Sequence, residues 1–203
     1  VGIDVGGNKD QSVKAEMLQG LHAVHLSIVR QSSQMRTPDA RITLSSNITD
    51  LPKLSQFADT WQGLASGDLP RLGRGFWEIP SLLSGFEWFQ NTVPDPIEFG
   101  GREWVLHWEK GRGGIAEISQ NPFRGKLGWG KPGVVVSQTG DLPATIYTGE
   151  IFTNNLSVVT PHAPKETLAS VYAYCTSSEF LSEIRAIDQS LKVTNATLGK
   201  APF

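Results

Sequence analysis

Apolar residues recur along this chain either at helical spacing or at every second position. The first spacing predicts helices and the second predicts strands. The first residues, Val1–Val5, alternate like a short strand. Apolar residues then recur at helical spacing in Gln11–Leu21 and predict a helix. Further patterns predict a strand at His22–Leu26, a helix at Ile28–Arg36, a strand at Ala40–Leu44 and a short helix at Leu51–Phe57 with Asp50 as its cap.

The second half of the chain is rich in strand patterns. Glu103–Glu109 places Trp104, Leu106 and Trp108 on one face and Glu103, Val105, His107 and Glu109 on the other, as in a half-buried strand. Three more strands are expected at Gly133–Ser137, Ala144–Tyr147 and Leu156–Thr160.

Two amphipathic helices are expected near the end of the chain, at Lys165–Cys175 and Ser178–Ile187, followed by a polar, turn-like tail at Lys192–Phe203. The mixture of helices and strands predicts an α+β fold, with a mixed, β-rich body and flanking helices.

A glycine-rich stretch, Trp61–Ile79, separates these two halves. It holds Asp68 and two arginines, Arg71 and Arg74, and ends in a strand-like tail with Phe76, Trp77 and Ile79. Its glycines fit either a binding loop or the turns of a simple connection. We therefore expect a trailing unit with its linker at residues 1–60 and a new domain at residues 61–203.

Composition restricts the class of protein. The chain has 203 residues, 39% of them hydrophobic and 19% charged, which is typical of a globular protein. Its one cysteine, Cys175, excludes an internal disulfide and a cysteine-rich zinc site, and it favours a cytoplasmic location. The sequence shows no signal peptide and no apolar run that predicts a membrane span. Because it opens on Val1 within a strand pattern, we expect it to derive from a larger protein.

The net charge of −2 does not suggest a nucleic-acid binder, but the distribution of charge does. Residues 110–131 hold five basic side chains and one acidic one, and six glycines lie among them. Glycine lets a main chain approach a phosphate backbone closely, and the cations pair with phosphates. A solvated loop without a ligand is the alternative for this basic segment.

No catalytic set is evident. We find no Ser-His-Asp or Cys-His arrangement, no paired carboxylates, no phosphate-binding loop and no glycine-rich cofactor loop between a strand and a helix. These patterns favour a binding domain over an enzyme, while acid and base residues distant in sequence leave a small enzyme open.

The order of several segments resembles a known family. Pro38–Ile42 (PDARI) is followed by Gln62–Asp68 (QGLASGD) and Arg71–Glu78 (RLGRGFWE), and later by Tyr147–Pro161, Leu168–Phe180 and Lys192–Phe203. Together they resemble the C-terminal target-recognition region of bacterial DNA adenine-N6 methyltransferases of the type II restriction-modification and BREX phage-defence families. The similarity covers nearly the whole chain.

The resemblance implies that this chain reads and grips double-stranded DNA for an upstream methyltransferase domain. That domain would hold the S-adenosylmethionine motif and the Asn-Pro-Pro-aromatic motif, both of which this segment lacks. No cofactor is then expected here, and residues 61–203 are expected to be target-recognition-domain-like.

The residue types suggest which side chains contact DNA. Cations of the basic segment are candidates for phosphate contacts: Lys110, Arg112, Arg124, Lys126 and Lys131. Arg71, Arg74, Gln138 and Asn154 are candidates for base edges, because Arg suits guanine and Asn or Gln suits adenine. The alternative is a carbohydrate-binding or similar β-rich module that uses Trp104, Trp108 and Trp129 as platforms.

Overall fold

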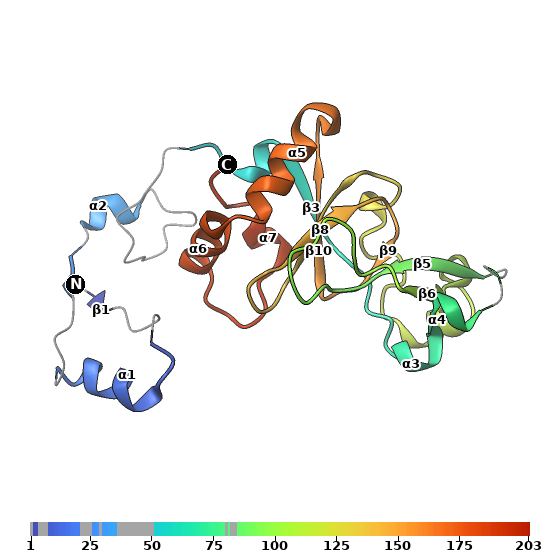
Figure 1. Cartoon of the computed structure of the whole chain (residues 1–203), viewed down its shortest axis with the longest axis horizontal. Helices are drawn as coiled ribbons and strands as arrows, with labels where there is room; N and C mark the ends of the chain where they lie inside the picture. The colour runs from blue at the N-terminus through green and yellow to red at the C-terminus, as the bar shows by residue number, and fades with distance from the viewer. Residues whose placement is uncertain are drawn as a thin grey trace. The chain divides into compact units, whose positions relative to one another are not determined.

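The protein is described from a computed structural model, which covers residues 2–3, 8–20, 26–28, 30–35, 51–79, 81 and 85–203. The chain divides into two compact units, Val1–Asp50 and Leu51–Phe203. The boundary expected at residues 60 and 61 falls inside a strand of the second unit, β3 (Ala58–Gln62). Figure 1 shows the elements of both units along the chain.

The first unit contains short elements. Strands β1 (Gly2–Ile3) and β2 (Leu26–Ser27) pair antiparallel. Helix α1 (Gln11–Leu18) begins where expected, because the Asp10 carboxylate accepts the free backbone N–H groups of Ser12 and Val13. The helix expected at Ile28–Arg36 is limited to α2 (Gln31–Gln34). Its N-cap is Arg30, and the strand expected at residues 40–44 lies outside the described residues.

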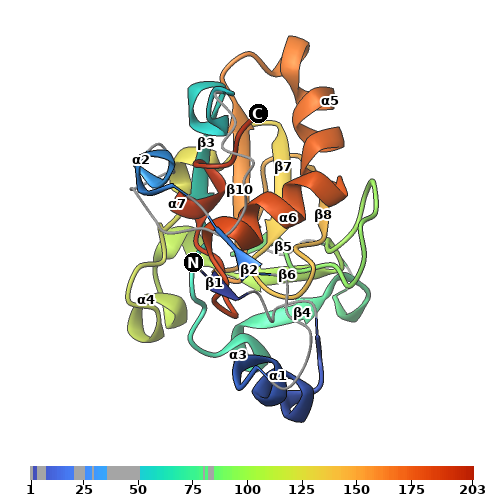
Figure 2. The same ribbon diagram turned by 90° about the vertical axis from the view of Figure 1, so that its left-hand side faces the viewer.

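The second unit is built on two four-stranded sheets, so the α+β class is confirmed. The first sheet has the order β3-β10-β7-β8, all antiparallel. Its strands β7 (Gly133–Ser137) and β8 (Ala144–Tyr147) match the sequence pattern, and β10 (Leu156–Pro161) extends it by one residue. Helices α5 (Pro164–Cys175) and α6 (Ser178–Ile187) lie against one face of this sheet (Figure 2).

The second sheet has the order β4-β6-β5-β9. It combines β4 (Gly73–Gly75), β5 (Phe86–Gln90), β6 (Trp104–His107) and β9 (Ile151–Phe152), and β9 runs parallel to β5. Two short helices, α3 (Leu69–Leu72) and α4 (Gly114–Ile118), contribute Leu72 and Ile115 to the core under this sheet. None of the helices in the described ranges is long and apolar enough to cross a membrane.

Strand β6 differs from the half-buried pattern expected for it. Leu106 is fully buried as expected, but Val105 on the opposite face is also fully buried. Val105 lies between Arg74 of β4 and Trp88 of β5 in the sheet register, and side chains opposite one another on neighbouring strands point to the same face. The strand is therefore covered on both faces.

Two other sequence expectations were wrong. Phe76–Glu78 forms a 3-10 turn instead of a strand-like tail, because the Glu78 carboxylate accepts the backbone N–H of Gly75 at 2.7 Å. The tail Lys192–Phe203 is not a surface turn. It contains helix α7 (Asn195–Leu198), and it buries Val193, Leu198 and Ala201 in the core under α5 and α6.

The helix expected at Leu51–Phe57 is only a 3-10 turn at Leu54–Gln56. The backbone N–H groups of Leu54 and Ser55 bond to the carbonyl oxygens of Ala201 and Gly199, at 2.8 and 2.9 Å. Because these donors are directed at the C-terminal tail, they start no helix.

Candidate nucleic-acid interface

The basic segment, residues 110–131, connects the two sheets. It leaves the second sheet after β6 and enters the first sheet at β7. Trp129 near its end packs against the core under the second sheet and also against the core on the helix-free face of the first sheet. The segment is therefore anchored in two cores and is not a free loop.

Phe123 is the centre around which part of this segment gathers. A side chain at Gly111 would meet the Phe123 ring, because its Cβ would lie 2.3 Å from Cζ. Lys110 precedes Gly111 in the chain, and Arg124 follows Phe123. Lys126 lies over the same ring, with its Nζ 5.6 Å from the ring centroid. We call Lys110, Phe123, Arg124 and Lys126 the Phe123 cluster.

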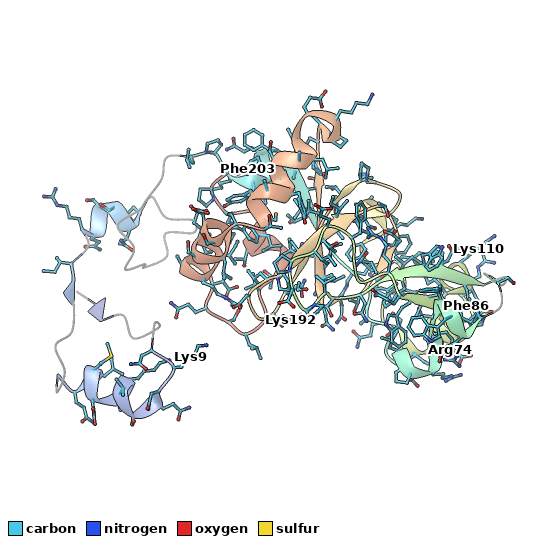
Figure 3. The ribbon with its side chains drawn as sticks, viewed as in Figure 1. Lys9, Arg74, Phe86, Lys110, Lys192 and Phe203 are labelled. Carbon is cyan, nitrogen blue, oxygen red and sulfur yellow. The ribbon has the colours of Figure 1, made fainter. Side chains whose placement is uncertain are left out.

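The Phe123 cluster exposes charge and an aromatic face to solvent. All four side chains are exposed, and the exposed fraction of Phe123 is 42%. None of the three cations forms an ion pair within the part of the chain that the structure describes. Figure 3 shows Lys110 at the end of the unit that holds the second sheet. Three exposed cations without an ion pair leave this surface complementary to an anion.

Contacts with Trp108 and Phe152 hold the Phe123 cluster in place. Phe123 packs edge-on against Trp108, with ring centroids 5.8 Å apart, and the Trp108 indole donates to the carbonyl oxygen of Pro122 at 3.2 Å. Gly125 has a positive φ of 83° and lies against the Phe152 ring, where a Cβ would be 2.6 Å from Cζ. Only glycine fits both conditions at this position.

Three other predicted cations lie outside this cluster and are also exposed. Arg71 of α3 reaches the start of α4, where its Nη2 lies 4.0 Å from the position of a Cβ on Gly114, two residues after Arg112. Lys131 lies over the Trp61 ring, with its Nζ 6.0 Å from the centroid. Arg71, Arg112 and Lys131 are all exposed, and each remains available to an anionic ligand.

The remaining candidates have structural partners. The Arg74 guanidinium donates to the carbonyl oxygens of Pro70, Arg71 and Gly73, and it therefore caps helix α3. Gln138 is 1% exposed and donates to the Leu156 carbonyl and the Ser157 hydroxyl, so we leave it out of the interface. Asn154 is half-buried, and its side-chain oxygen accepts from the Thr153 hydroxyl.

The tryptophans proposed as a carbohydrate platform pack against the core under the second sheet. Trp104, Trp108 and Trp129 are partly buried there, and the rings of Trp108 and Trp129 meet edge-on at 5.2 Å. The tryptophans with large exposed areas are instead Trp77 and Trp88, at 65% and 43%. The sequence pattern alone could not separate these two groups.

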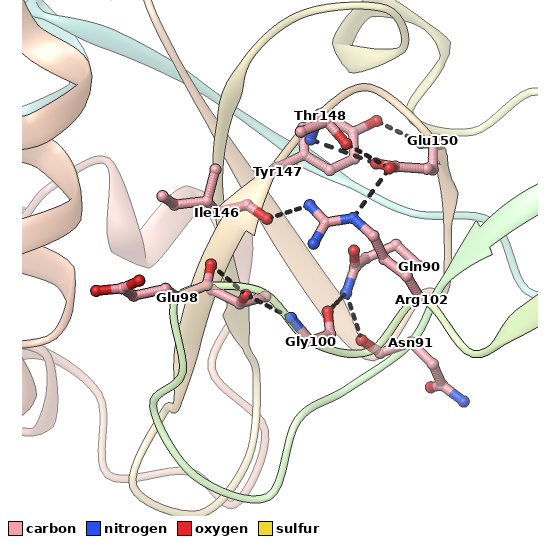
Figure 4. A network of polar contacts seen from close by, with 10 residues as sticks. Gln90, Asn91, Glu98, Gly100, Arg102, Ile146, Tyr147, Thr148 and Glu150 are labelled. Carbon is pink, nitrogen blue, oxygen red and sulfur yellow. Dashed lines mark hydrogen bonds and ion pairs between the residues drawn. The ribbon is translucent and has the colours of Figure 1, made fainter.

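A partly buried polar network ties the two sheets together (Figure 4). Arg102, just before β6, pairs with Glu150 at 3.0 Å and donates to the carbonyl oxygen of Ile146 in β8. Burial raises the pKa of the Glu150 carboxyl, but the hydrogen bond from Thr148 and the Arg102 charge outweigh it and hold that pKa below its usual value. The network joins the residues next to β6 and β9 of the second sheet to β8 of the first sheet.

The described residues contain no group of three or more His, Cys, Asp or Glu side chains that could hold a metal ion. Cys175 is buried among apolar side chains, and burial raises the pKa of its thiol to about 12. A thiol of this kind is a poor nucleophile at neutral pH.

Sequence reasoning found the cations but missed Phe123 as their centre, because that role depends on the contact with Gly111. The spacing of Gly111 and Phe123 gives no sign that they touch. No family model matches the chain, and no curated protein shows significant similarity to it.

Proposed function

We propose that the second unit binds double-stranded DNA through the Phe123 cluster, with Arg71, Arg112 and Lys131 extending the contact. The observation that supports this most is the Phe123 cluster itself: three exposed cations without ion pairs among the described residues, one of them over an exposed ring, on a segment anchored in two cores. Cations paired with backbone phosphates release condensed counterions, and this release drives much of the affinity of proteins for DNA.

Because the basic segment is anchored, it should bind DNA more tightly than a solvated loop that carries the same charges. Ordering a residue that is free before binding costs roughly 1–2 kcal/mol. The contacts of Gly111, Gly125 and Trp129 already hold the backbone of the basic segment, so binding would order mainly side chains. The acidic residues elsewhere in the unit would repel the phosphates and so orient the duplex towards this surface.

The wider role that we propose follows from the family resemblance. The chain would recognise the target site for an S-adenosylmethionine-dependent adenine-N6 methyltransferase of a bacterial restriction-modification or phage-defence system, in the cytoplasm. The methyl transfer would take place in an upstream domain. Arg71 and Asn154 are then the candidates for base contacts, and the phosphate contacts would help to offset the few kcal/mol that flipping the target adenine costs.

The test removes two cations of the Phe123 cluster together, in Arg124→Ala/Lys126→Ala. DNA affinity is measured by mobility shift over a range of salt concentrations, on several unrelated duplexes. We expect weaker binding to all sequences alike, with the slope of log K against log salt reduced by about 2, because each lost phosphate contact removes about one unit.

A matched variant, Lys53→Ala/Lys165→Ala, removes two exposed lysines from the same unit outside the basic segment. It should leave the salt slope close to that of the unmodified chain. If both double variants change the slope equally, or if neither changes it, the Phe123 cluster is not the DNA-binding surface.

A further inference from the structure

A pocket opens where strand β3 begins and strand β10 ends, beside the start of β7 and the start of α5. It has a volume of about 360 Å³ and is lined by Asp59, Lys131, Pro132, Thr160, Pro161, His162 and Pro164. Asp59 and Thr160 are opposite one another in the register of the two strands, so their side chains lie on the same face of the sheet. The size is within the range of small-ligand sites.

The Thr160 hydroxyl gives this pocket a fixed hydrogen-bond donor. Thr160 is 3% exposed, and its oxygen accepts the indole N–H of Trp61 at 2.9 Å. The hydroxyl hydrogen has no acceptor in the described part of the chain. A buried hydroxyl that still has a hydrogen to donate favours an acceptor brought by a ligand.

One ammonium group and one imidazole share the pocket with this hydroxyl. The Lys131 ammonium lies over the Trp61 ring and makes no ion pair with a described residue. The His162 imidazole lies with its Nε2 3.3 Å from Oδ1 of Asp59. The Asp59 carboxylate therefore orients the imidazole ring.

We propose that this pocket binds one phosphate group, held by the Lys131 ammonium, the Thr160 hydroxyl and the His162 imidazole. A phosphate accepts hydrogen bonds from several donors at once, whereas a metal ion would find only one carboxylate here, already paired with His162. The three proline rings provide apolar walls for a sugar attached to that phosphate.

The phosphate could come from a DNA backbone or from a free phosphate. The first source rests on the proposed function, because Lys131 belongs both to the basic segment and to this pocket. The same three groups of the pocket would bind a phosphate from either source. The experiment therefore tests inorganic phosphate and DNA separately.

The experiment follows the indole N–H signal of Trp61 by NMR, since that group bonds directly to Thr160. The signal is assigned with Trp61→Phe. The whole chain is titrated with inorganic phosphate at constant ionic strength, with chloride as reference, and separately with a short duplex. We expect the signal to shift and saturate with phosphate, and both Lys131→Gln and His162→Gln to weaken phosphate binding at least about tenfold.

Lys165→Gln, which removes an exposed lysine close to the pocket but not lining it, should bind phosphate normally. Unchanged signals of the other five indoles in each variant would show that the fold is intact. Saturation with both ligands assigns the pocket to a DNA phosphate, and saturation with phosphate alone assigns it to a free phosphate.

No shift of the Trp61 signal with phosphate, or equal shifts in the two pocket variants and the unmodified chain, would overturn the proposal. Failure of the wider DNA-binding function would look different. Arg124→Ala/Lys126→Ala would then bind DNA as well as the unmodified chain, while phosphate would still shift the Trp61 signal.

Discussion

Single residues in this protein act mainly by fixing the position of charge. Arg74 and Arg102 are cations like those of the Phe123 cluster, yet both are held by protein acceptors. Their charges stabilise a helix end and an inter-sheet contact, and they are not free for a ligand. The distinction between a structural and a binding cation therefore depends on the acceptors nearby and not on the residue type.

Glu150 makes this structural use of charge testable through pH. Its pKa is lowered in the folded chain from an ordinary value of 4.5, so its stabilising contribution is present above about pH 4.5 and is lost as pH falls through the folded value. Glu150→Gln should cost about 2 kcal/mol of unfolding free energy at neutral pH, because it removes charged hydrogen bonds. Urea unfolding at a series of pH values would measure this cost.

The difference between Glu150→Gln and the unmodified chain should shrink as the solution becomes more acidic. Glu166→Gln, at an exposed carboxylate of α5, is the control and should show almost no difference at any pH. If the difference in unfolding free energy between Glu150→Gln and the unmodified chain stays constant down to pH 3, the ionised Glu150 carboxylate does not stabilise the fold.

At the scale of elements, the basic segment behaves as a fixed part of the structure although little of it is regular. Its regular parts are α4 and two 3-10 turns, Glu109–Gly111 and Lys126–Gly128. Glu109 and Lys110 both have positive φ, of 48° and 59°, which is uncommon for residues other than glycine. The tertiary contacts of Phe123 and Trp129, and not local preference, determine its shape.

A glycine substitution tests that anchoring. Gly125→Ala places a Cβ 2.6 Å from the Phe152 ring and 2.9 Å from the Gln62 carbonyl oxygen, at a φ of 83°. We expect overpacking and backbone strain to lower the unfolding free energy by about 3 kcal/mol in total. We also expect weaker DNA binding. Chemical denaturation and the mobility-shift assay would measure the two effects.

Gly140→Ala separates strain from overpacking. Gly140 has a similar φ of 65°, but a Cβ there meets nothing within 4 Å. It should cost only about 1 kcal/mol and leave DNA binding unchanged. Equal losses for the two variants would show that the segment does not depend on its contact with Phe152.

The elements that the sequence predicts well are those whose pattern is local. Strand β7 and helix α6 have the predicted bounds, because a short apolar run between turns and a capped amphipathic stretch each carry their own signal. Strands β4 and β9 have three and two residues, and they exist only through distant partners such as Phe89, which pairs with Ile151. No local pattern encodes such pairing.

The same limit applies to the candidate site. The cations of residues 110–131 are visible in the sequence as a charge window. Their grouping around Phe123 is not visible, and neither is the pocket that brings Asp59 and Lys131 together, because those residues are far apart in the sequence. Charge could be predicted from the sequence, and geometry could not.

At the scale of the whole molecule, the first and last residues of the second unit contact one another. Lys53 forms a β-bridge with Pro202, and the Phe203 N–H donates to the Pro52 carbonyl at 2.8 Å. The tail also buries Val193, Leu198 and Ala201 in the core under α5 and α6. Stability of the unit should therefore depend on the last residues far more than on the residues before Leu51.

Two truncations test that dependence. The fragment of residues 51–203 should unfold cooperatively, with a midpoint within a few degrees of that of the whole chain, because the core clusters lie inside it. Removal of residues 193–203 should abolish cooperative unfolding, because it opens the core around Leu54 and Phe180. Circular dichroism during heating would measure both, and a cooperative transition in the second truncation would contradict the assigned role of the tail.

The bridge between Lys53 and Pro202 places the first and last segments of this unit side by side. A domain with adjacent ends can be inserted into a loop of another protein without stretching either partner. Residues 51–203 inserted into a loop of a host protein should therefore leave the architecture of the host intact.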